Sequence, residues 1–301
     1  IFLALLLSRL VFAQEDATPL VAFVQDNQLR TASVNDVGAD GISRLEAIFQ
    51  NLGAETTTIE LQSAIPDDID IVVIVGAERA LSSSNVARLA QHIFRGGNVL
   101  IATDPSSFND VRSNNEGDEF DEFLRALYGI GMQNGLIVGN WYNTETIQNL
   151  RDVRLASRPE DIVVTSLVDD LLRYDLPVQV WGARPITVDA FGPDTEAFPI
   201  TYFEQGYAET DLRDTERNFR RNLNPRSIGY NIGEDPTGRL LISGYAINAQ
   251  HDSRIALLGD SDAVRNLFGL ARIPNADTLP RHPGNQLLIE RLASWLLEAP
   301  E

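Results

Sequence analysis

The sequence predicts an α/β fold with a three-layer, doubly wound, mainly parallel sheet and a more irregular, partly antiparallel second half. Two observations support this prediction. Ile71–Val75 and Val99–Ala102 are short apolar runs without polar alternation, which is typical of strands buried on both faces of a parallel sheet. Between them, Val86, Leu89 and Ile93 recur at helical spacing. Strand, helix and strand with short connections form a right-handed βαβ unit, so both strands are expected in one parallel sheet.

The same reasoning predicts the other elements of the first half. In chain order they are a strand at Leu20–Val24, a helix at Ile42–Leu52, a strand at Thr56–Leu61, the βαβ unit with its helix capped by one of Ser82–Ser84, an exposed loop at Pro105–Asp118, a helix at Phe120–Leu127 and a strand at Leu136–Val138. Gly53 and the Gly96–Gly97 pair are expected to end the first two helices, as C-terminal glycines do.

The second half has a less regular pattern. Its expected elements are strands at Ile162–Thr165, Val178–Trp181, Ile186–Phe191, Leu240–Ala246 and Ile255–Leu258, a hairpin turn at Asn248–Ser253 and a helix at Leu287–Leu297. Pro193–Pro236 is expected to be the least regular stretch. No Pro/Ser-rich linker divides the chain. We therefore expect a single domain at 20–298, with a regular βαβ half at 20–150 and an irregular half at 151–298.

Ile1–Ala13 is apolar apart from Ser8 and Arg9, and it is too short to span a bilayer. Val11 and Ala13 suit the −3 and −1 positions of a signal-peptidase site, so residues 1–13 are expected to be a signal peptide. The alternative is a membrane anchor whose start is missing. In the first case the mature protein begins near Gln14, and in both cases the body lies outside the cytoplasm.

The composition excludes several kinds of chemistry. The chain has no cysteine, which excludes disulfides, thiolate nucleophiles and cysteine metal sites. All 24 basic residues are arginine, which excludes Schiff-base chemistry and a P-loop lysine. The net charge of −19 argues against non-specific binding to nucleic acid or to anionic membrane. No spacing of the three histidines predicts a zinc site, and no cofactor is expected.

Four stretches together resemble a known family. They are RGGNVLIATDP (Arg95–Pro105), YAETDL (Tyr207–Leu212), RIALLGDSDAVRN (Arg254–Asn266) and the run from Asn285 to Trp295. Their order is similar to that in the extracytoplasmic domain of the gliding-motility-type ABC-transporter auxiliary proteins. The resemblance implies a flavodoxin- or amidotransferase-like sheet without catalytic apparatus. It also implies an ABC-type permease or a partner extracytoplasmic domain as partner, with a small ligand as a further option. Membrane association would then come through the partner or a missing anchor.

Polar side chains follow the predicted strands at one edge of the sheet. They include Asp104, Asp260 and Asp262. Ligands of open α/β sheets bind beyond the carboxyl ends of the strands, so these residues are candidates for a binding crevice. Ser261, Asn285 and Glu209 are assigned to the same crevice for a ligand or partner. The alternative is that these residues bond local N–H groups and cap the elements that follow, Asn285 capping the last helix. Grouped carboxylates can hold a hard cation, but the resemblance implies no metal.

Gly259–Ser261 leaves an enzyme as the alternative function. GDS after an apolar strand resembles the nucleophile block of the SGNH esterases, with Asp277 and His282 as the later acid and base. Ser261 stands late in the chain, however, and Asp277 and His282 are five residues apart where that family has three. The leading hypothesis is therefore a non-catalytic binding module of an ABC-type or gliding-type assembly. A secreted serine hydrolase using Ser261 and a sensor of sugar or peptide are the alternatives.

Overall fold

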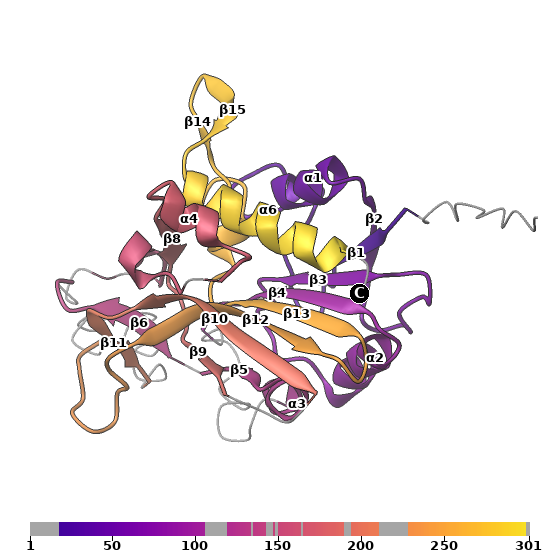
Figure 1. The fold of residues 1–301 in the computed structure, drawn as a ribbon, viewed down its shortest axis with the longest axis horizontal. Coiled ribbons are helices and arrows are strands. Elements are labelled where there is room, and N and C mark those ends of the chain that lie inside the picture. Colours follow the sequence, from indigo (N-terminus) through magenta and orange to yellow (C-terminus); the bar gives the residue numbers. More distant parts are fainter. Residues whose placement is uncertain are drawn as a thin grey trace, which may run out of the picture.

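The computed structural model describes residues 18–105, 119–133, 135–142, 147, 150–163, 165–189, 194–210 and 228–298. They form a mixed α/β fold around a nine-stranded sheet (Figure 1). Adjacent parallel strands make up one part of this sheet. In spatial order they are β2 (Glu55–Ile59), β1 (Leu20–Val24), β3 (Ile71–Val75), β4 (Asn98–Ala102) and β13 (Ser253–Leu258). The predicted α/β class with a mainly parallel sheet is therefore confirmed.

The rest of the sheet is antiparallel and comes largely from the second half of the chain. Its strands are β12 (Leu240–Asn248), β10 (Thr195–Phe203), β9 (Ile186–Val188) and β5 (Ile130–Met132). β12 lies beside β13 and also pairs with β10 and β9, and β9 pairs with β5. The turn between β12 and β13 lies where Asn248–Ser253 was predicted to form a hairpin.

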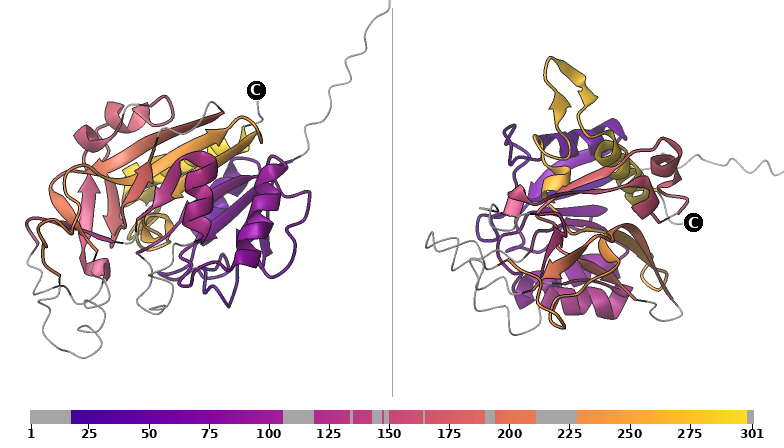
Figure 2. Two further views of the ribbon diagram at one scale, coloured as in Figure 1. Left: turned by 90° about the horizontal axis from the view of Figure 1, so that it is seen from below. Right: turned by 90° about the vertical axis from the view of Figure 1, so that its left-hand side faces the viewer.

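Three smaller strand pairs lie outside this sheet: β6 (Leu136–Gly139) with β11 (Gly206–Glu209), β7 (Arg154–Ser157) with β8 (Val178–Trp181), and β14 (Arg272–Ile273) with β15 (Ala276–Pro280). The hairpin of β14 and β15 stands off from the body of the protein (Figure 2). The helices are α1 (Ser43–Asn51), α2 (Ser83–Phe94), α3 (Glu119–Tyr128), α4 (Asp169–Arg173) and α6 (Pro283–Leu297), and single 3₁₀ turns are η2 (Leu150–Asp152), η3 (Pro159–Asp161) and η4 (Asp262–Val264).

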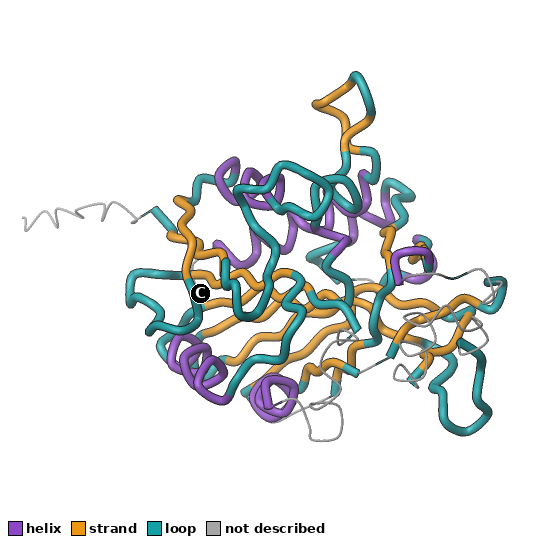
Figure 3. Tube along the Cα trace, turned by 180° about the vertical axis from the view of Figure 1, so that it is seen from behind, coloured by secondary structure: helices purple, strands orange, loops and turns teal. Residues whose placement is uncertain are grey.

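The parallel strands are buried because side chains of helices cover both faces of the sheet. Every residue of β3 is buried. Val73 and Val75 pack in a cluster with residues of α1 and α6, whereas Val72 and Ile74 pack in a cluster with residues of α2 and α3. Figure 1 shows α1 and α6 above the sheet and α2 and α3 below it, and Figure 3 shows the same arrangement from behind. The predicted neighbours β3, β4 and β13 are thus parallel and adjacent.

Two parts of the second half differ from the prediction. A strand was predicted at Ile162–Thr165, but the described residues of this segment form no strand, and Ile162 makes an isolated bridge to Thr201. The described residues between Pro193 and Pro236 include two strands that the sequence pattern did not predict, β10 and β11. β10 contains Pro199, which argues against a strand in a sequence pattern, but β12 is the one described strand that pairs with β10, which lies off the main path of the sheet.

Some predictions fall on residues outside those that the structure describes. They are the signal peptide or anchor at 1–13 and most of the loop at 105–118. Among the residues that are described, none of the helices has the length and apolar character needed to cross a bilayer.

Ser82 is the cap of α2, in agreement with the prediction that one of Ser82–Ser84 starts this helix. Its Oγ accepts a hydrogen bond from the Asn85 N–H at 3.3 Å. Ser82→Ala is expected to lower the free energy of unfolding by about 1 kcal/mol, because one N–H of the first turn loses its acceptor. Urea denaturation of the full chain measures this loss. Ser82→Asp keeps an acceptor and should stay close to the wild type, and equal losses in both variants would contradict the capping role.

Candidate functional site

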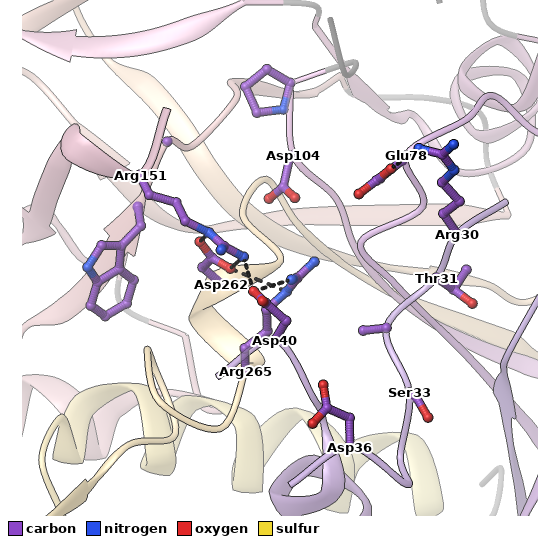
Figure 4. Close-up of a pocket in the computed structure, with 14 residues that line it drawn as sticks. Arg30, Thr31, Ser33, Asp36, Asp40, Glu78, Asp104, Arg151, Asp262 and Arg265 are labelled. Carbon is purple, nitrogen blue, oxygen red and sulfur yellow. Dashed lines mark hydrogen bonds and ion pairs between the residues drawn. The ribbon is translucent and has the colours of Figure 1, made fainter. Parts of the chain in front are cut away.

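A cleft of about 530 Å³ lies at the carboxyl edge of the parallel strands. This is the edge where ligands of open α/β sheets bind. Its lining comes from the chain after β1 (Arg30, Thr31, Ala32, Ser33, Asp36, Asp40), after β3 (Glu78), after β4 (Asp104, Pro105), after β13 (Asp262, Arg265) and from the second half (Arg151, Trp181, Gly182). Figure 4 shows these side chains around the cavity. Asp104 and Asp262, both predicted for the crevice, line it.

Asp262 anchors a cluster of alternating charges on one wall of the cleft. Its carboxylate is buried and receives a bidentate pair of hydrogen bonds from Arg151, at 2.5 Å from Nε and 2.8 Å from Nη2. Arg265 Nε lies 3.3 Å from the same carboxylate. Asp40 completes the cluster, because its Oδ1 lies 2.6 Å from Arg151 Nη2 and 3.2 Å from Arg265 Nη1. These four residues join the loop after β1, the η2 turn and the η4 turn.

The charges in this cluster stabilise one another. Burial acts to lower the pKa of Arg151, but its bonds and proximity to Asp262 and Asp40 raise that pKa. Burial likewise acts to raise the pKa of Asp40, and the guanidinium groups of Arg151 and Arg265 outweigh it and lower the pKa. Burial raises the pKa of Asp262, while Arg151 opposes that shift. Arg151 therefore remains charged, and carboxylates hold both arginines in place.

Asp104 is fixed by Ser261, which follows the neighbouring strand β13. The Ser261 N–H donates to Asp104 Oδ1 at 2.8 Å, and the Ser261 hydroxyl donates to Oδ2 at 2.6 Å. Ser261 is fully buried, whereas Asp104 is partly exposed in the cleft. Ser261, which was predicted for the crevice, does not line this cleft and supports Asp104 from behind.

Asp260 is also fully buried and does not line the cleft. Its two oxygens accept hydrogen bonds from the Trp181 N–H at 2.7 Å and the Asp262 N–H at 2.9 Å. Burial raises its pKa well above the usual range, and the nearby carboxylates of Asp262 and Asp104 raise it further. As predicted, Asp104 and Asp260 end neighbouring strands, but Asp260 joins backbone segments and has no access to a ligand in the cleft.

Asn285 and Glu209 were predicted for the crevice but do not line it. Asn285 does not precede α6, because the helix begins at Pro283. Its side-chain amide binds both backbone groups of Gln179 at 2.8 Å, which ties α6 to β8. Glu209 is fully buried in β11 and accepts a hydrogen bond from the Gly229 N–H at 2.9 Å. Both residues hold parts of the second half in place.

The arginines of the cleft were missed from the sequence. Arg265 is far from Gly76 in the sequence but packs over it at the end of β3. A Cβ atom built on Gly76 would lie 2.3 Å from Nη2 of Arg265. Gly76 has a φ of 63°, so the strand end needs glycine for its conformation as well. The rule that ligands bind at the carboxyl ends of parallel strands could have indicated Arg30 and Asp40, because the chain leaves β1 at the same edge of the sheet. No local signal indicates Arg151.

The comparisons with known proteins bear on the part of the chain that contains β1 to β4. Residues 18–154 match a family described as an ABC-type uncharacterized transport system. The predicted resemblance to the ABC-transporter auxiliary proteins is thereby confirmed. This family match includes the cleft residues from Arg30 to Arg151, whereas Trp181, Asp262 and Arg265 lie beyond it.

Solved structures give a likeness of the fold. The N-terminal domain of mmIFT52 is 12% identical with a TM-score of 0.56, and the match covers 94% of this chain and 99% of that one. A ThuA-like protein from Bacteroides uniformis is 10% identical with a TM-score of 0.45, and the match covers 93% of each chain. The likeness to mmIFT52 concerns the fold alone. No curated protein matches the chain.

Proposed function

We propose that this protein is a non-catalytic, extracytoplasmic binding module of an ABC-type transport or gliding-type assembly. The observation that carries the proposal is the match of residues 18–154 to the ABC-type transport family. Its partner in the proposal is the permease or another extracytoplasmic domain of the same system, and the cleft is the binding site. The extracytoplasmic location rests on the apolar segment Ile1–Ala13 and its Val11/Ala13 pattern.

The proposed architecture is the three-layer, doubly wound amidotransferase-like fold. The parallel strands lie in the order β2-β1-β3-β4-β13, which corresponds to the order 2-1-3-4-5 of flavodoxin-like sheets with β13 in the fifth place. In such sheets the crevice between β1 and β3 is the place for a ligand. The loop after β1 and Glu78 after β3 line the cleft in agreement with this arrangement.

The surroundings of Ser261 support a non-catalytic role. A serine nucleophile needs an accessible hydroxyl that donates to a general base, usually a histidine. The Ser261 hydroxyl is fully buried and donates to Asp104. His282 packs its ring against Trp181, with the ring centroids 5.2 Å apart, and burial lowers its pKa. This arrangement favours a supporting role for Ser261 over the alternative of a secreted serine hydrolase.

Capture from membranes tests the proposal. The full chain is expressed with a C-terminal tag in the organism that encodes it. It is then captured from detergent-solubilised membranes, and the proteins captured with it are identified by mass spectrometry. We expect the ATPase and the multi-span permease of one ABC system, and a tag-only bait gives the background. Hydrolysis of p-nitrophenyl esters is measured in parallel. The absence of a permease, or ester hydrolysis that Ser261→Ala abolishes, would overturn the proposal.

A further inference from the structure

The arginines that line the cleft all have ion-pair partners, but two of its carboxylates have none among the described residues. Each of the three lining arginines has a carboxylate partner: Arg30 pairs with Glu78 at 3.2 Å, and Arg151 and Arg265 pair with Asp40 and Asp262. Two lining carboxylates, Asp36 and Asp104, make no ion pair with any residue that the structure describes. The cleft thus holds two uncompensated negative charges in a chain of net charge −19, and its field favours a cation.

Asp104 is set up to receive a donor with two parallel N–H groups. Ser261 donates one hydrogen bond to each carboxylate oxygen of Asp104. Each of these oxygens therefore keeps a second lone pair that can accept another hydrogen bond. Figure 4 shows the Asp104 carboxylate pointing into the cavity, with Asp36 on the opposite side of the drawn lining. Because Ser261 is fully buried, this orientation is held without help from a ligand. A guanidinium group is the cation whose planar fork fits two neighbouring carboxylate oxygens.

We propose that the cleft binds the guanidinium group of an arginine side chain that the partner protein presents, with Asp104 as the bidentate acceptor and Asp36 as a second negative charge. This inference rests on the proposed function for the source of the arginine. The volume of about 530 Å³ lies within the range of about 300–1,000 Å³ that ligand pockets occupy. The residues that the structure describes contain no group of three His, Cys, Asp or Glu that suits a metal ion, which favours an organic cation.

Asp104→Asn is the informative variant. Its side-chain oxygen can still accept from the Ser261 N–H, and the hydroxyl of Ser261 can rotate to accept from the new amide, so the fold should persist. The variant loses the negative charge and one of the two outward acceptor positions. Asp68→Asn is the matched control, because Asp68 is exposed before β3, at the amino edge of the sheet, and the change in net charge is the same.

The first measurement is calorimetric titration of the full chain with N-acetyl-L-arginine methylamide at low salt. We expect weak, saturable binding to the wild type and the Asp68→Asn control, and binding at least about tenfold weaker in Asp104→Asn. The matching citrulline probe has the same shape without the charge and should not bind. A third probe carries lysine in place of arginine. The inference would be overturned if the arginine probe did not bind, if the citrulline or lysine probe bound equally well, or if Asp104→Asn bound the arginine probe as the wild type does.

The second measurement separates this inference from the proposed function and identifies the source of the cation. Capture of the permease is repeated with the two variants, and a reduced yield for Asp104→Asn alone supports an arginine of the partner. Capture that Asp104→Asn leaves unchanged overturns the inference and leaves the proposed function intact. Binding of the free arginine probe tighter than about 10 µM, with no permease captured, would instead assign the cleft to a free small molecule. That result would overturn both the partner arginine and the proposed function.

Discussion

Gly259→Ala is expected to lower the free energy of unfolding by about 3 kcal/mol, because the new methyl group would collide with two backbone carbonyls. A Cβ atom at Gly259 would lie 2.2 Å from the Arg184 oxygen and 3.1 Å from the Ile242 oxygen. Neighbouring backbone hydrogen bonds restrain both carbonyl groups from shifting. The Arg184 N–H donates to the Gly259 oxygen at 2.7 Å, and the Gly259 N–H donates to the Ile242 oxygen at 2.7 Å. The missing side chain at Gly259 is therefore what lets the Arg184 backbone come this close.

Gly229→Ala is the matched control for this substitution. A Cβ atom at Gly229 would meet no heavy atom within 4 Å, and the residue is not in the left-handed region. Its unfolding free energy should stay within about 0.5 kcal/mol of the wild type. Urea denaturation of both variants of the full chain gives the comparison. A loss below about 1 kcal/mol for Gly259→Ala would mean that Arg184, β12 and the end of β13 do not meet as closely as the structure has them.

The parallel part of the fold could be predicted because its signal is local. Strands such as β3 are buried on both faces, and continuous apolar runs of four or five residues have few other interpretations. β10 could not be predicted in the same way, since it lies off the main path of the sheet, contains Pro199 and has register shifts against β12. Its position depends on β12, which follows it by more than thirty residues in the chain.

The cleft could be predicted in part. The ends of β4 and β13 gave Asp104 and Asp262, since parallel strands bring their carboxyl ends to one edge. The pattern did not separate Asp262 from its neighbours Asp260 and Ser261, because all three follow β13 closely and all three are buried, and Asp262 alone of the three lines the cleft. Arg151 could not be predicted, because its partner Asp262 is 111 residues away and the η2 turn that presents it has no sequence signature.

Asp260→Ala is the second substitution with a large expected effect. It leaves the buried N–H groups of Trp181 and Asp262 without acceptors, which should lower the free energy of unfolding by about 2–4 kcal/mol near pH 5. Asp260→Asn keeps the shape and one acceptor oxygen, so its loss should be smaller. Asp68→Ala removes an exposed carboxylate and serves as the control for the change in charge.

The pH dependence of that loss tests the protonation of Asp260. Its pKa in the folded protein is raised above the usual value near 3.8, by burial first and then by the Asp262 and Asp104 carboxylates. Between the two pKa values the folded state holds a proton that the unfolded state has released, so this group's contribution to stability falls as the pH rises through the folded pKa. Neither Asp260→Ala nor Asp260→Asn has this contribution. The stability difference between wild type and Asp260→Ala should therefore shrink from about pH 4.5 to about pH 8, while carboxylates that do not interact with Asp260 affect both proteins alike. A difference that stays constant or grows over this range would mean that Asp260 is ionised throughout, with its charge compensated by the two N–H groups that it accepts from.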